Sequence, residues 1–156
     1  MMIRVGIASA VLTITAQAQV IPDFGFMPDG GCGLFAEAFG TDADAAVVLA
    51  ESGDFDFWTE LTLARGADLD ETQVRILAGF LSLNTPVPAA AESTDVAAVL
   101  PQDGRDIALS ECQSCRALFT GCLMQDRDVA GWMGVFKSPF HMTMKLTEAE
   151  RQTFAD

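Results

Sequence analysis

A helical segment with the same start signal occurs twice in this chain. Asp70 and Gln73 stand three residues apart, as the capping box at the start of a helix requires, and an amphipathic apolar pattern follows them. Thr147 and Glu150 form the same pair 77 residues later. The repeat predicts two related helical units within a chain of 156 residues.

The surroundings of the two helix starts favour a duplication. Leu69 and Leu146 precede the two boxes at the same offset, and Trp58 and Trp132 lie upstream of them. Capping boxes are common, so a chance alignment is the alternative explanation. The matched tryptophans weigh against chance, and we expect an internal repeat of helices.

A proline- and alanine-rich stretch over residues 86–94 separates the two copies and is typical of a linker. We therefore expect a first lobe over residues 19–88, a linker over 89–104 and a second lobe over 105–156. No run of residues alternates in hydrophobicity, so the predicted fold is mainly α, with two small helical lobes. The second helix start is followed by only ten residues, so the second lobe is expected to be truncated and the chain to be a fragment or a decaying copy.

The first 18 residues have the order of parts found in a secretory leader. Arg4 gives a positive start, an apolar run covers residues 5–15, and Ala16-Gln17-Ala18 matches the small-residue cleavage pattern. The run is too short to cross a bilayer. We expect cleavage after Ala18, export to the periplasm and no membrane span in the mature chain; a buried first helix of the fold is the alternative.

Charge and composition exclude several classes of partner and site. The net charge is −13, and loss of Arg4 with the leader makes it −14, so neither nucleic acid nor an anionic membrane surface is an expected partner. A protein with a basic docking face is the predicted partner, although the charge also serves solubility. The single histidine excludes zinc sites that need two imidazoles.

The second lobe carries a C-x-x-C at Cys112 and Cys115, followed by Trp132, the run 141–144 and the capped helix that starts at Thr147. In these features the chain resembles the c-type cytochrome family, in which a helix leads to C-x-x-C-H, a loop carries a distal ligand, and a final helix often opens with L-T-x-x-E. Residues 146–150 fit that opening. The resemblance covers residues 105–156 well and 30–88 faintly.

The resemblance implies a cytochrome c-like lobe with haem c attached through Cys112 and Cys115. It implies His141 as the first candidate for the distal ligand, with Met142 or Met144 second. The pocket would have apolar walls, for which Phe119, Trp132 and Phe136 are available. The implied function is periplasmic electron transfer, or service as an accessory subunit of a redox enzyme, rather than catalysis.

The chain departs from the family pattern at one position in this motif. Arg116 stands where the family has its proximal histidine. A guanidinium has no lone pair to donate to iron, so Arg116 cannot replace that ligand. The first lobe offers Cys32 alone, without a second cysteine or a histidine after it, and we expect no haem there.

The cysteines also have interpretations that require no haem. Cys112 and Cys115 could form a structural disulfide, with Cys32 and Cys122 either free or joined across the lobes. If residues 108–122 are helical, Cys112, Cys115 and Cys122 share one face. A thiol oxidoreductase would need a βαβ pattern, which the sequence lacks.

The His141, Met142 and Met144 cluster has two further interpretations. Imidazole and thioethers suit Cu(I), so the cluster is a candidate copper site. The plainer alternative is a surface histidine beside methionines that fill a small core. The corresponding alternative functions are a Cu(I)-binding protein and a haem-free interaction module that kept the cytochrome-like fold.

Overall fold

The computed structural model describes residues 27, 29–65, 68–93, 95–113, 117 and 119–156. The expected leader with its cleavage site, Cys115 and Arg116 lie outside these residues. All regular secondary structure within these residues is helical, which confirms the mainly α fold. In this part of the chain no helix has the length and apolarity needed to cross a membrane.

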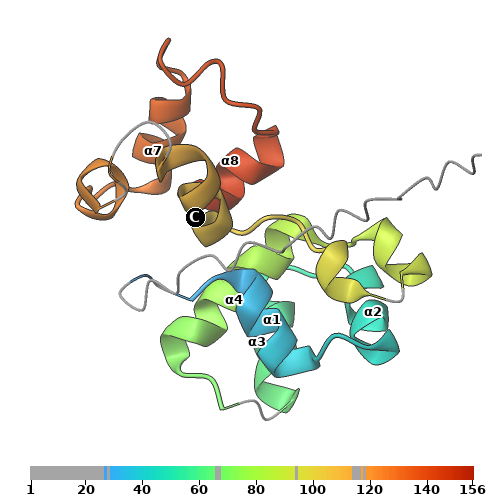
Figure 1. Cartoon of the computed structure of the whole chain (residues 1–156). Helices are drawn as coiled ribbons and strands as arrows, with labels where there is room; N and C mark the ends of the chain where they lie inside the picture. The colour runs from blue at the N-terminus through green and yellow to red at the C-terminus, as the bar shows by residue number, and fades with distance from the viewer. Residues whose placement is uncertain (1–26, 28, 66–67, 94, 114–116, 118) are drawn as a thin grey trace, which may run out of the picture.

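The first lobe contains four α-helices (Figure 1), which are α1 (Gly31–Phe39), α2 (Ala43–Ala50), α3 (Phe55–Arg65) and α4 (Glu71–Asn84). The predicted capping box opens α4. The Gln73 amide donates to Asp70 Oδ1 at 2.8 Å, and the Asp70 amide donates to Gln73 Oε1 at 2.8 Å. The helix ends at Asn84, because Pro86 cannot continue it.

The core of the first lobe is built from large apolar side chains of α1, α3 and α4. Trp58 is fully buried, and its indole Nε1 donates to the Gly53 carbonyl at 3.1 Å. A buried indole N–H needs such a partner. Apolar residues of all four helices surround it in one cluster, including Leu34, Phe35, Leu49, Leu77 and Leu81.

The stretch expected to be a linker is folded onto the first lobe. It forms two short 3₁₀ helices, Pro88–Glu92 and Val96–Ala98, and the first of them packs on α2. Val87, Ala90 and Val96 are buried in the core cluster, and the Val87 amide donates to the Leu49 carbonyl at 2.7 Å. These apolar side chains close one side of a small core, which explains why the stretch is ordered against it despite its prolines.

The second lobe follows and lies against the first (Figure 1). Its elements are α5 (Gly104–Ile107), a π-helical turn (Ala108–Cys112), a second π-helical turn (Phe119–Leu123), α7 (Val129–Phe136) and α8 (Glu148–Ala155). The second predicted capping box is also present. The Thr147 amide donates to Glu150 Oε2 at 2.6 Å, and the Glu150 amide donates to Thr147 Oγ1 at 3.2 Å.

The helix α8 holds the second lobe together and joins it to the first. The Phe154 ring meets the rings of Trp132 and Phe136 edge to face, with centroids 5.3 and 5.5 Å apart. The other side of α8 packs on α4, where Asn84 Nδ2 donates to Thr153 Oγ1 at 3.0 Å. The short closing helix therefore completes the second core and the contact between the lobes.

The two lobes repeat one helix crossing. The first helix of each lobe packs on its closing helix, α1 on α4 and α5 on α8, with a glycine at the contact. Gly31 lies against the Phe80 ring, and a Cβ on Gly104 would lie 3.3 Å from the Thr153 carbonyl oxygen. In each lobe, therefore, the opening helix begins with a glycine at its contact with the closing helix.

Candidate functional site

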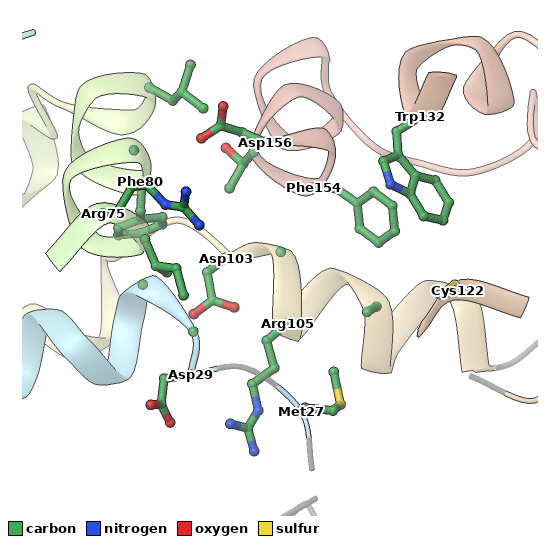
Figure 2. Close-up of a pocket in the computed structure, with 18 of the residues that line it drawn as sticks. Met27, Asp29, Arg75, Phe80, Asp103, Arg105, Cys122, Trp132, Phe154 and Asp156 are labelled. Atoms are coloured by element: carbon green, nitrogen blue, oxygen red, sulfur yellow. The ribbon is translucent and has the colours of Figure 1, made fainter. Parts of the chain in front are cut away.

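A cavity of about 840 Å³ lies between the two lobes and has residues of both in its wall (Figure 2). Its volume falls within the range that proteins use for small-molecule ligands. The first-lobe side includes Phe55, Ile76, Phe80 and Leu83, and the second-lobe side includes Ala108, Leu123, Trp132 and Phe154. The wall is thus largely apolar, with aromatic rings from both lobes.

Charged groups also line the cavity, and three of them, Asp29, Asp103 and Arg105, lie near the start of α1 and α5. Arg75, Arg105, Asp29, Asp103 and Asp156 all line the cavity. Figure 2 shows Arg105 reaching down from its helix beside Met27, while Arg75 lies next to Phe80. Charges of both signs in the wall of a largely apolar cavity suit a ligand with an apolar body and polar groups.

The cytochrome-like segment forms the second-lobe side of this cavity. Of the three aromatic residues expected to line a pocket, Trp132 does so. Phe136 is instead buried behind Phe154, in the cluster with Ile107 and Leu146. The side chain of Phe119 lies outside the described structure. Phe154, which lines the cavity beside Trp132, belongs to the repeated helix start and was not among the expected residues.

Two cysteines meet at this side of the cavity. Cys122 lines the wall, and Cys112 packs with it against Met27 and Ala108. A side-chain hydrogen bond from Cys112 lowers the pKa of the Cys122 thiol to about 7, although burial acts in the opposite direction. The continuous helix considered for residues 108–122 is not formed, since Ala117 is not helical. The two thiols are brought together by two separate π-helical turns instead.

Cys32 lies in different surroundings, at the start of α1. Its Sγ donates to the Pro101 carbonyl at 3.1 Å. Burial, followed by the negative charges of Asp103 and Asp106, raises the pKa of this thiol far above its ordinary value. No disulfide joins Cys32 to Cys122, and the two side chains pack against different clusters.

Cys32, Asp103 and Asp106 place one possible metal-ligand atom each within 4.8 Å of one another. The two carboxylate oxygens of Asp103 already accept hydrogen bonds from two helix starts. Oδ2 accepts from the Cys32 amide at 2.9 Å, and Oδ1 accepts from the Asp106 amide at 2.9 Å. The cluster is therefore accounted for by helix capping between the lobes.

The predicted ligand cluster of the second lobe lies outside the described cavity wall. Met142 is 68 % exposed, whereas Met144 packs against the Ile107 and Phe136 cluster. His141 Nδ1 is buried and has no hydrogen-bond partner among the described residues, and the His141 backbone amide donates to the Ser138 carbonyl at 2.9 Å. The assignment of His141, Met142 and Met144 as haem or copper ligands stays a prediction.

The site residues match some parts of a haem c site and not others. The apolar wall and a C-x-x-C cysteine packed beside Cys122 suit the body of a porphyrin and its attachment. The described wall holds no imidazole, and the residue after the second cysteine of the motif is Arg116. The residues therefore do not fit a haem c with a proximal histidine.

Comparisons with known proteins found no match for this chain among family models, curated proteins or solved structures.

Proposed function

We propose that this protein is an exported, c-type-cytochrome-like accessory subunit of a redox enzyme, in which the haem site is degenerate. One observation carries the proposal. The segment that resembles the family forms a ring-lined cavity wall beside the first cysteine of the attachment motif, while that wall and the motif lack a nitrogen ligand. A protein with these features keeps the fold of an electron carrier but not its iron ligands.

The charge of the chain suits such a subunit. Acidic residues outnumber basic ones by 22 to 9, so the surface attracts a partner with a basic docking face. Electrostatic attraction of this kind raises association rates and weakens with added salt. The accessory role therefore predicts a salt-sensitive complex with a basic partner protein.

An electron carrier with bound haem is the second candidate, and the position of Cys112 favours it. Cys112 packs beside Cys122, which lines the cavity, so a thioether from Cys112 would hold a porphyrin at this wall. Cys112 and Cys115 would hold the haem, which supplies reversible one-electron chemistry when bound. This candidate requires an iron ligand other than residue 116, for which His141 is the one imidazole of the chain.

Replacement of one residue separates the two candidates. In a host with a cytochrome maturation system, Arg116→His restores the attachment motif and should give covalent haem at far higher occupancy than the unmodified chain. The measurements are a haem-stained denaturing gel and a reduced pyridine spectrum, with the Cys112→Ala, Arg116→His double variant as the negative control. A folded Arg116→His protein without haem would show that the cavity no longer accepts a porphyrin.

A further inference from the structure

We propose that Cys112 and Cys122 form a reversible disulfide at the second-lobe side of the cavity. The disulfide would join two separate π-helical turns, Ala108–Cys112 and Phe119–Leu123, which contact each other. π-helical turns are rare and frequently occur at functional sites. This inference does not rest on the proposed function.

The geometry of the two thiols suits bond formation. Cys112 and Cys122 share a side-chain hydrogen bond, and both pack against the cluster of Met27 and Ala108. A disulfide needs Cβ atoms roughly 3.5–4.5 Å apart, and two hydrogen-bonded thiols reach this by small rotations.

The chemistry is a thiol–disulfide exchange with a small disulfide such as oxidised glutathione. The Cys122 thiolate attacks one sulfur of the oxidant, forms a mixed disulfide and releases one thiolate. Cys112 then loses its proton to solvent and attacks the Cys122 sulfur, which releases the second thiolate. Two protein thiols lose two electrons and two protons, and one oxidant disulfide becomes two thiols.

Access and acidity both favour Cys122 as the attacking thiol. Cys122 lines a cavity of about 840 Å³, which is large enough to admit a small peptide disulfide. Its lowered pKa places a large thiolate fraction at neutral pH. The bond would consume Cys112, so it competes directly with attachment of haem at the C-x-x-C motif.

The tryptic map of this chain distinguishes the possible pairings. Cleavage after Arg105, Arg116 and Arg127 gives one peptide, 106–116, with Cys112 and Cys115, and another, 117–127, with Cys122. The reduced full chain is incubated with oxidised and reduced glutathione. The exchange is stopped with acid, the remaining thiols are alkylated near neutral pH under denaturing conditions, and the peptides are analysed by mass spectrometry. We expect the two peptides to be joined by a disulfide that reductant removes.

Single substitutions identify the cysteine in the 106–116 peptide that forms the bond. The link should persist in Cys115→Ser and disappear in Cys112→Ser and in Cys122→Ser, with circular dichroism showing that each variant is folded. A ring closed within 106–116, a link that survives in Cys112→Ser but not in Cys115→Ser, or full alkylation of Cys122 after oxidation would each overturn the proposal.

Discussion

At the scale of single residues, two cysteines of the described chain occupy opposite electrostatic surroundings. Cys122 accepts a hydrogen bond from a neighbouring thiol, which stabilises its thiolate and lowers its pKa to about 7. Cys32 is buried beside two carboxylates, which disfavour its thiolate and raise its pKa. The pair therefore provides an internal comparison of reactivity within one protein.

We predict that iodoacetamide modifies Cys122 much faster than Cys32 in the reduced, folded protein at pH 7.5, because only the thiolate reacts. The rate at Cys122 should rise with pH about a midpoint near 7, and Cys112→Ala should move that midpoint toward the ordinary value of 9.0. Site-specific mass spectrometry measures both rates. Equal rates at the two cysteines would contradict these assignments.

Asp106 provides a pH-dependent test of stability. Burial, followed by the charge of Asp103, raises the pKa of this carboxyl. The folded state then holds the proton more tightly than the unfolded state, so stability falls as pH rises from below 3.8 through the raised pKa. Asp106→Asn removes this loss and should raise the melting temperature at pH 7.

The same substitution should give no gain at about pH 3, where the carboxyl is protonated in both states. Thermal unfolding followed by circular dichroism at the two pH values is the measurement. Glu148→Gln is the matched control, since Glu148 is exposed, also lies in the first turn of a helix and takes no part in the capping box of Thr147 and Glu150. A gain in melting temperature at pH 3 as large as at pH 7 would argue against the raised pKa as the cause.

The residue scale also shows what the sequence can predict. Asp70 with Gln73 and Thr147 with Glu150 were predictable because capping is a local interaction within four residues. The contact between Cys112 and Cys122 was not, since it depends on two π-helical turns that no spacing rule anticipates. The double role of Asp103 was missed for a similar reason: one of its partners, the Cys32 amide, lies 71 residues away.

At the scale of elements, Asp103 caps two helices from different lobes. Its buried carboxylate accepts from the second residue of α1 and from Asp106 in α5, and Gly30 has no room for a Cβ beside it. A normal N-cap is worth about 1 kcal/mol. Loss of two caps at a buried site also leaves unsatisfied amides, which adds to the cost.

We therefore expect Asp103→Ala to lower the free energy of unfolding by about 2–4 kcal/mol. The matched control is Asp42→Ala, which removes an exposed cap of α2 alone and should cost about 1 kcal/mol. Denaturant unfolding of both variants gives the comparison. If the two substitutions cost the same, Asp103 does not stabilise both helix starts.

Two glycines of α1 test the repeated helix crossing. Gly31 faces the Phe80 ring with no room for a methyl group, whereas Gly33 faces open space. Gly31→Ala should destabilise the protein by about 1–3 kcal/mol through overpacking. Gly33→Ala should stabilise it by up to about 1 kcal/mol, because alanine is the better helix former.

The opposite signs of these two effects can be read from melting temperatures. A stabilising Gly31→Ala would mean that α1 does not cross α4 at this glycine.

The expected linker shows what composition cannot predict at the scale of elements. Its prolines suggested an extended chain, but Val87, Ala90 and Val96 are buried in the first core. Burial, which composition does not give, places this stretch in the first lobe.

At the scale of the whole molecule, two small lobes share one large cavity and one inter-lobe cap. The mainly α fold followed from the absence of alternating hydrophobicity and from two capped, amphipathic segments. The cavity could not be predicted from the sequence, because its wall combines Phe80 of the first lobe with Trp132 and Phe154 of the second. Such a wall arises only when α8 packs on α4 as well as on its own lobe.

We propose that this chain keeps a cytochrome-like lobe without a ligated haem iron. The most direct test is the visible absorption spectrum of the unmodified protein purified from its native host, in oxidised and reduced forms. We predict no Soret band above that of a Cys112→Ala, Cys115→Ala control. A stoichiometric Soret band that sharpens and shifts on reduction, with haem retained on a denaturing gel, would contradict it and establish the electron carrier.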